Sequence, residues 1–213
     1  MAVPQPEPEV DASRRAQRRL QHHDLGRRQL LDAAEEVFGQ KGYHETTLKE
    51  VAQRAEFSVG SVYSFFESKD DLFLQIFARR GDELLAEIEE AVAQDRSPVE
   101  QLHLLVDVEV GFFRRHPHFR RLVLRYANVP QLAARTPLHQ RAGGNYERAT
   151  GLQAEIITRG QAAGALREGD AEALSRIFSG LVLSFETLEA SDGATEWLPL
   201  AEFHDIVERA FVR

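Results

Sequence analysis

The sequence predicts an all-α protein in which a small N-terminal unit of three helices precedes a larger helical domain. Three observations lead to this fold class. Apolar residues recur at intervals of three and four from Arg27 to the end of the chain. Residue types that cap helices stand before several of these segments. No segment alternates apolar and polar residues convincingly, as a half-buried strand would. The 213 residues suffice for one sizeable core, or for one core and a small appended domain.

The first expected helix covers residues 27–41. Its apolar stripe consists of Leu30, Leu31, Ala34, Val37 and Phe38. Gly42 follows at the position where a helix commonly ends with a left-handed residue.

Two short helices and a tight turn are expected next. Thr47 and Glu50 have the spacing of a capping box, which starts a helix carrying Val51, Ala52 and Ala55 at helical intervals. Ser58 is the expected N-cap of the following segment, residues 59–66. Val62 and Phe66 lie four residues apart and therefore face inward together.

The outward residues of segment 59–66 are small or carry a hydroxyl group: Val59, Gly60, Ser61, Tyr63 and Ser64. Gly60 and Ser61 would let a helix approach base edges closely, and Tyr63 and Ser64 can donate to phosphates. Ser68 is expected to cap a further helix with Asp71 at its third position, which leaves Lys69 at the first. A cation is unfavourable beside that positive helix end unless an anion such as phosphate joins it. The pattern is typical of a DNA-binding helix-turn-helix.

In these motifs the chain resembles the tetracycline-repressor (TetR) family of bacterial transcriptional regulators. The resemblance rests on the first helix with its glycine stop, the Thr-Thr entry, the Ser-x-Gly-Ser-x-Tyr run and the Phe-x-Ser-Lys exit, within residues 27–75. Beyond them it rests on helix number and order. It implies a regulator that binds double-stranded operator DNA as a homodimer and responds to a small-molecule effector. The DNA contacts it implies are Thr46, Thr47, Ser58, Gly60, Ser61, Tyr63, Ser64 and Lys69. Lys49 and Arg54 are either backbone contacts or solvated surface cations.

Two residues depart from the family pattern. Glu56 stands where the family usually has glycine, and glutamate adopts a left-handed conformation less readily, so we expect a strained or differently closed turn. Phe65 stands where the family often has a histidine, so one phosphate contact is expected to be missing or replaced by packing.

The charge is distributed unevenly along the chain. The formal net charge is −8, and residues 1–80 carry 12 basic and 13 acidic side chains against 14 and 21 in residues 81–213. The one basic concentration precedes the first helix: Arg14, Arg15, Arg18, Arg19, Arg27 and Arg28. It is either an arm that follows the minor groove or the phosphates, or a solvated extension. Residues 1–11 are rich in Pro and Glu and are expected to be flexible.

The remaining helices are expected at residues 68–93, 97–116, 118–126, 137–163 and from Asp170 onward, with a loop at 128–136 and a terminal helix near the C-terminus. The helices after Asp170 carry wide apolar stripes. These either pack within the subunit or form part of a four-helix dimer interface, which we favour. The residues predicted for that interface are Leu174, Phe178, Leu181, Phe185, Phe203, Val207 and Phe211.

The resemblance also implies an effector site in the larger domain. The candidate lining residues are Phe112, Phe113, His116, Arg125, Tyr126, Tyr146 and Phe178, although core packing is an alternative for each aromatic one. Arg125 and His116 would matter most for an anionic effector.

The expected organisation is a flexible or partly helical basic arm (residues 1–23), a helix-turn-helix DNA-binding domain (24–72) and a ligand-binding and dimerisation domain (73–213). We expect a cytoplasmic repressor that a small molecule releases from a palindromic operator. No catalytic motif, metal site, cofactor site or membrane segment is expected, and there is no cysteine. The rival interpretation is a helical interaction or adaptor dimer whose helix-turn-helix is vestigial.

Overall fold

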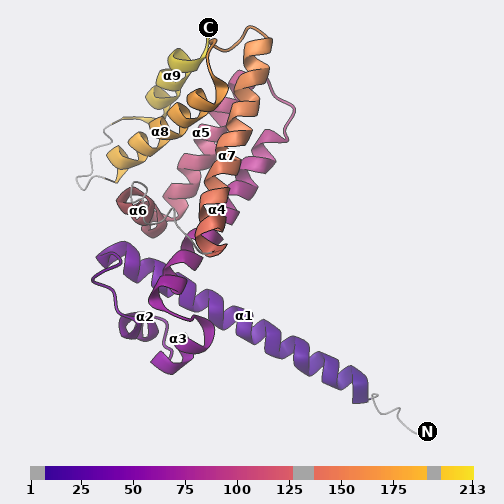
Figure 1. Ribbon diagram of the computed structural model, residues 1–213, viewed down its shortest axis with the longest axis vertical. Helices are drawn as coiled ribbons and strands as arrows, with labels where there is room; N and C mark the ends of the chain where they lie inside the picture. The colour runs from indigo at the N-terminus through magenta and orange to yellow at the C-terminus, as the bar shows by residue number, and fades with distance from the viewer. Residues whose placement is uncertain (1–7, 127–136, 191–197) are drawn as a thin grey trace.

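A computed structural model describes residues 8–126, 137–190 and 198–213 (Figure 1). Those residues form nine α-helices and no strand beyond an isolated bridge between Leu166 and Val212. The helices are α1 Pro8–Lys41, α2 Leu48–Arg54, α3 Val59–Phe65, α4 Lys69–Val92, α5 Pro98–Arg115, α6 Pro117–Tyr126, α7 Pro137–Ala162, α8 Ala171–Glu189 and α9 Leu200–Phe211. The all-α prediction is confirmed. The loop predicted at 128–136 lies outside the described residues.

The helix starts follow the caps that the sequence predicts. The hydroxyl of Thr47 accepts from the amide of Glu50 while the Glu50 carboxylate accepts from the Thr47 amide at 2.9 Å. Ser58, Ser68 and Asp170 each accept the backbone N–H three residues on, at 2.7–3.0 Å. These bonds satisfy amides that a helix start leaves without an intrahelical partner.

Helix α1 is much longer than the predicted 27–41 segment. It begins at Pro8, so the basic arm is helical and continuous with the first helix of the DNA-binding unit. The expected flexibility of residues 8–11 therefore needs correction, while residues 1–7 lie outside the described part. In Figure 1 the first half of α1 projects past α2 and α3, away from the C-terminal helices.

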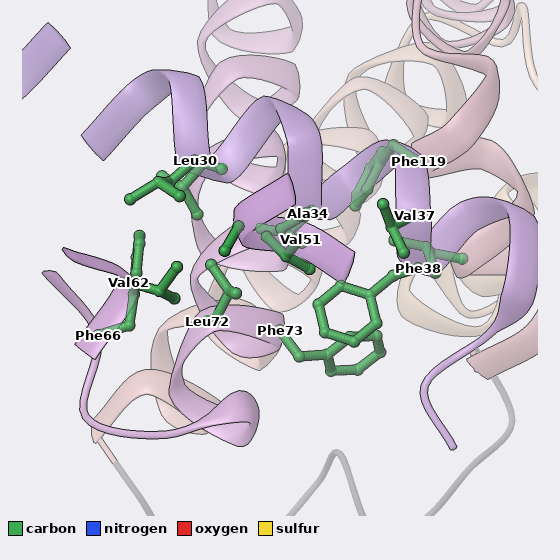
Figure 2. Packing of buried hydrophobic residues seen from close by; sticks show 14 of the residues in the cluster. Leu30, Ala34, Val37, Phe38, Val51, Val62, Phe66, Leu72, Phe73 and Phe119 are labelled. Carbon is green, nitrogen blue, oxygen red and sulfur yellow. The ribbon is translucent and has the colours of Figure 1, made fainter. Parts of the chain in front are cut away.

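Two hydrophobic clusters make up the described core. One joins α1–α4 to the facing ends of α5 and α6, and Figure 2 shows Phe119 of α6 on the same side of it as Val37 and Phe38. The other lies among α4, α5, α7, α8 and α9. Burial of each large apolar side chain contributes about 1.5–3 kcal/mol. Because the first cluster includes Phe73, Phe112 and Phe119, the boundary proposed at residues 72/73 runs through a shared core.

Helix α6 lies between the C-terminal bundle and α1 (Figure 1). The two backbones approach closely at Gly39, where an added Cβ would stand 2.8 Å from the carbonyl oxygen of His118. One turn further on, the amide of Tyr43 donates to the hydroxyl of Tyr126 at 2.7 Å. The C-terminal domain therefore contacts the DNA-binding unit through main-chain atoms as well as side chains.

Candidate nucleic-acid interface

The turn between α2 and α3 depends on a left-handed glutamate. Glu56 has φ +60°, the one positive φ at a non-glycine residue in the part of the chain that the structure describes. The amides of Glu56 and Phe57 donate to Gln53 and Ala52 at 3.2 and 2.8 Å, which closes a Schellman motif. The turn thus closes as it would with glycine, and the strain expected from the sequence is present.

Helix α3 has the inward and outward faces that the sequence predicts. Val62 and Phe66 are buried, whereas Val59, Gly60, Tyr63 and Ser64 are exposed, Tyr63 to 59%. An added Cβ on Gly60 would meet only the Ser58 hydroxyl, at 3.7 Å. This face is therefore open to a base edge or a phosphate.

The serine hydroxyls of α3 already have intramolecular partners. The Ser58 and Ser61 hydroxyls lie 2.8 Å apart, and Ser64 donates to the carbonyl of Ser61 at 2.6 Å. Each hydroxyl still has spare hydrogen-bonding capacity, because it is both donor and acceptor. These bonds fix the rotamers that a DNA contact would use.

The prediction for Thr46 needs correction. Its side chain is buried, with 1% exposed, and its hydroxyl donates to the carbonyl of Gly42 at 2.7 Å. It thus supports the loop before α2. Thr47 is exposed at the start of α2 and remains a candidate contact.

The N-terminal position of Lys69 has an internal explanation. Its ammonium lies 4.4 Å from the centroid of the Tyr43 ring and 3.4 Å from the carbonyl of His44. The Tyr43 hydroxyl bonds to Asp70, the next residue of α4. These contacts hold the ammonium of Lys69 beside the start of α4, at the edge of the candidate DNA-binding surface.

The cations on α2 divide into two kinds. Arg54 pairs with Glu36 of α1 at 2.5 Å, while Lys49 is exposed. On the same helix, Glu50 bonds to Lys41, and that bond together with the Thr47 cap lowers the pKa of Glu50 to about 2. Arg54 therefore contributes to the packing of α2 on α1, and Lys49 is the better candidate for a phosphate.

Phe65 packs where the family pattern often has histidine. Its ring centroid lies 4.7 Å from that of His23, and its edge would be 3.1 Å from a Cβ on Gly26. Packing against α1 thus replaces a polar contact at this position.

The predicted effector residues do not come together. Phe112, Phe113 and His116 belong to the cluster beside α6, where burial and nearby Arg80 lower the pKa of His116. Arg125 and Tyr126 lie against the Gly42–Tyr43 loop of α1. Of the two others, Tyr146 is 55% exposed and Phe178 packs against Phe211 in the second cluster. These seven residues therefore do not line one cavity, because the helices turn them toward different neighbours.

A buried polar group inside the C-terminal domain was missed. Gln153 of α7 donates to the carboxyl of Glu109 at 3.1 Å and accepts from Ser179 at 2.9 Å. Glu186 of α8 is 1% exposed, neither of its carboxyl oxygens has a hydrogen-bond partner, and Arg120 stands 3.5 Å away. Burial raises the pKa of Glu109 and of Glu186 to about 7. The sequence signal that could have revealed this buried group is the presence of Glu109 and Glu186 within otherwise apolar helix faces.

Five of the seven predicted dimer residues also need correction. The members that are buried within the protomer core are Phe178, Phe185, Phe203, Val207 and Phe211. Leu174 and Leu181 are half-buried against the same core. An apolar stripe does not distinguish burial within a subunit from burial between subunits. The exposed apolar residues of α8 and α9 are instead Ile177, Leu188 and Ile206.

A surface groove of about 740 Å³ separates the outer faces of α7 and α8. Its lining includes Thr150, Ala154, Thr158, Ala171 and Ser175, none of which was predicted as a ligand contact.

In the described ranges, no three His, Asp or Glu side chains gather so as to hold a metal ion. Over the same ranges, no helix combines the length and the apolar character of a membrane span.

Residues 30–76 match the model of bacterial regulatory proteins of the tetR family. This segment contains α2, the left-handed turn, α3 and the start of α4. In this segment the chain carries a DNA-binding region of the tetR family. The DNA-binding transcriptional regulator expected from the sequence is thereby confirmed.

The similarity of this protein to other proteins extends past the DNA-binding unit. It is 24% identical over 182 residues to the fatty acid metabolism regulator protein of Bacillus subtilis, covering 84% of this chain and 87% of that one. The structure of Bacillus subtilis FadR with stearoyl-CoA aligns with a TM-score of 0.71 at 20% identity, over 85% of this chain and 95% of that one. A putative regulator from Saccharomonospora viridis in complex with choline aligns at 0.75 and 20%, over 89% and 99%. The two structural matches show a shared fold.

Proposed function

We propose that this TetR-family protein is a homodimeric repressor whose effector is an acyl-CoA. The observation that carries the proposal is the extent of the match to the Bacillus subtilis fatty acid metabolism regulator, which includes the C-terminal domain as well as the helix-turn-helix. The likeness to a regulator bound to stearoyl-CoA agrees with it.

The chemistry of the C-terminal domain supports the two parts of such an effector. Its second cluster supplies apolar side chains from α5, α7, α8 and α9, the kind of lining that an acyl chain requires. The end of α5 and the whole of α6 carry five arginines: Arg114, Arg115, Arg120, Arg121 and Arg125. Arg121 and Arg125 are exposed, and guanidinium groups suit the phosphates of coenzyme A.

The contact between α6 and α1 supplies the route to the DNA. An effector that moves α6 would also move α1, because Gly39 touches His118 through main-chain atoms and Tyr126 holds the Tyr43 amide. Movement of α1 would change the separation of the two α3 helices in a dimer. The two α3 helices of a dimer must lie about 34 Å apart to reach half-sites on the same face of the DNA.

For the DNA contacts we propose the residues that are at least partly exposed: Thr47, Ser58, Gly60, Ser61, Tyr63, Ser64 and Lys69. For the dimer interface we propose the outer face of α8 with α9, centred on Ile177, Leu188 and Ile206, which carries the exposed apolar residues of both helices. A palindromic operator follows from a two-fold dimer. We further propose a cytoplasmic location and no catalytic activity.

Ligand-dependent melting and operator release test the effector class. The purified protein is heated with palmitoyl-CoA, coenzyme A or palmitate, and the same compounds are added to its complex with a selected operator duplex. We expect palmitoyl-CoA alone to raise the melting temperature and to release the duplex, since a ligand of the free form stabilises it by mass action. Replacing Arg121 and Arg125 with Gln should weaken palmitoyl-CoA binding. If palmitoyl-CoA leaves the binding of the duplex unchanged, the proposal is rejected.

A second effector class is favoured by the carboxyls of Glu109 and Glu186. A quaternary ammonium ion would meet buried acidic groups, and the Saccharomonospora viridis regulator was solved with choline. Choline in the same melting assay separates the two classes. If choline stabilises the wild type but not Glu186→Gln, the cationic effector is correct and the acyl-CoA is not.

The rival interpretation as an adaptor is tested by a gel shift. DNA upstream of the gene that encodes this protein is mixed with it at low salt, with and without unrelated competitor DNA. Binding that salt weakens and competitor does not supports the regulator. Absence of binding at low salt would favour the adaptor.

A further inference from the structure

The N-terminal half of α1 forms a helical basic arm beside the recognition helix. Residues 8–24 extend roughly 25 Å as a helix. All of the arginines on the arm are exposed: Arg14, Arg15, Arg18 and Arg19. Figure 1 shows this stretch running past α3 with no other helix beside it.

The direction of the arm is fixed by packing at its base. The ring of Phe65, the last residue of α3, contacts His23 and stands over Gly26, which is buried. The guanidinium of Arg27 lies 5.5 Å from the centroid of the Phe66 ring. The arm therefore leaves the DNA-binding unit at the C-terminal end of α3, and its position depends on that of the recognition helix.

The arrangement of charge on the arm calls for an external anion. Arg14 and Arg18 lie four residues apart and Arg19 follows Arg18, so like charges lie close together on the helix surface. Like charges at this spacing weaken a helix, and a helix of this length without packing is marginal in water. Phosphates of a duplex would offset both effects. The rest of the chain has a net acidic charge.

We propose that the α1 arm lies along the phosphate backbone of DNA flanking the operator, through Arg14, Arg18 and Arg19, and so lengthens the DNA segment that each protomer covers. This inference rests on the proposed function, since it requires α3 to be seated in the major groove. The arm spans about seven base pairs at 3.4 Å per step. Because the contacts are to phosphates, the added affinity is independent of the flanking sequence.

Two duplexes of different length test the arm. A binding site is first selected from a random pool with the full chain, and is then made as a core duplex and as a duplex with about eight extra base pairs of varied sequence on each side. The wild type is compared with a triple variant, Arg14→Gln, Arg18→Gln and Arg19→Gln. A matched control removes as many charges from exposed sites of the C-terminal domain: Arg148→Gln, Arg209→Gln and Arg213→Gln.

We expect the wild type and the control to prefer the longer duplex, whereas the triple variant binds both duplexes alike. On the longer duplex the slope of log affinity against log salt should fall by about 0.9 for each arginine lost. A variant with a broken arm, Gln17→Pro, should lose the length preference with every arginine retained, and Gln17→Ala should keep it.

Four outcomes would overturn the arm contact. Equal binding of the two duplexes by the wild type, or an unchanged preference in the triple variant, rejects it directly. If Leu20, which is 65% exposed, instead joins two arms of separate protomers, then Leu20→Lys would lower the oligomeric state without DNA. If no sequence is selected from the pool, the proposed function itself fails, and this inference fails with it.

Discussion

The Lys69 ammonium lies 4.4 Å from the centre of the Tyr43 ring, so a cation at a helix N-terminus is held in place by an aromatic face. A cation–π contact of this exposed kind contributes about 0.5–1 kcal/mol. The same ammonium remains partly exposed beside the start of α4, where a phosphate would complete its coordination.

Lys69→Ala should weaken DNA binding about equally on all sequences and lower the salt slope by about one per protomer, because one phosphate contact is lost. It should also lower the free energy of unfolding slightly through the lost ring contact. Fluorescence anisotropy across a salt series measures the slope. Gln53→Ala, an exposed change on α2, is the control, and an unchanged slope for Lys69→Ala would remove Lys69 from the contact set.

Glu56→Gly should stabilise the protein by about 0.5–1 kcal/mol. Glycine takes a φ of +60° without the penalty of a Cβ, although it gains more freedom in the unfolded chain. Urea denaturation measures the change, which should appear in the midpoint and not in the slope. Glu56→Ala removes the same charge and should give no gain. Equal effects of Gly and Ala would mean that charge, not backbone strain, is responsible.

Glu109→Gln should flatten the dependence of stability on pH between about 4.5 and 7. Burial raises the pKa of Glu109 to about 7, so the folded state binds more protons than the unfolded state in this window. The stability associated with the protonated carboxyl is therefore full below 4.5 and is lost as pH rises through 7. The loss is on the order of 3 kcal/mol at most.

Chemical denaturation of the wild type and Glu109→Gln at pH 5 and pH 8 measures this dependence. We expect the variant to be the more stable protein at pH 8 and similar to the wild type at pH 5. Glu155→Gln, an exposed change on α7, should follow the wild type at both pH values. A variant as pH-dependent as the wild type would contradict the assignment.

Gly39→Val should separate α6 from α1. Its Cβ would stand 2.8 Å from the His118 carbonyl oxygen, a main-chain atom that cannot move aside as a side chain does. Overpacking of this kind costs about 1–3 kcal/mol. Operator release by the effector should weaken more than operator binding itself. Gly151→Val, where no atom lies within 4 Å of an added Cβ, is the control in melting and release assays.

Ile177→Lys should convert the dimer to monomers, since it places a charge at the centre of the outer face of α8. Ile177 is 54% exposed, so the fold of the isolated protomer should not suffer. Sedimentation velocity distinguishes the two states. Tyr146→Lys alters an equally exposed apolar residue on α7 and should remain dimeric. A dimeric Ile177→Lys protein would place the interface elsewhere.

Local rules predicted the starts of the capped helices, though not that of α1, and the inward face of α3. Thr47, Ser58 and Ser68 cap helices as their spacing indicates, because a cap depends on residues within three positions of each other. The strained turn at Glu56 was one of two alternatives that its departure from the family's glycine left open, and the positive φ selects it. These features need no knowledge of the distant chain.

The prediction that the seven effector residues line one cavity was wrong, as was the prediction for five of the seven dimer residues. In both cases contacts between distant parts of the chain decide how the side chains are oriented. Phe185 stacks on Phe203 with centroids 4.5 Å apart, which buries both within one protomer. Arg125 points to α1 because α6 crosses that helix at Gly39. A helical stripe gives the face that is apolar but not the neighbour that covers it, and the sequence alone does not contain the crossing of α6 and α1.

The bond from the Tyr43 amide to the Tyr126 hydroxyl joins residues 83 positions apart and belongs to no helix. Protection of that amide against hydrogen exchange therefore depends on the contact between the two parts of the chain, and not on helix fraying. Amides inside α1 report the stability of the DNA-binding unit itself. The ratio of the two exchange rates therefore measures how often the C-terminal domain separates from the DNA-binding unit, without an attached probe.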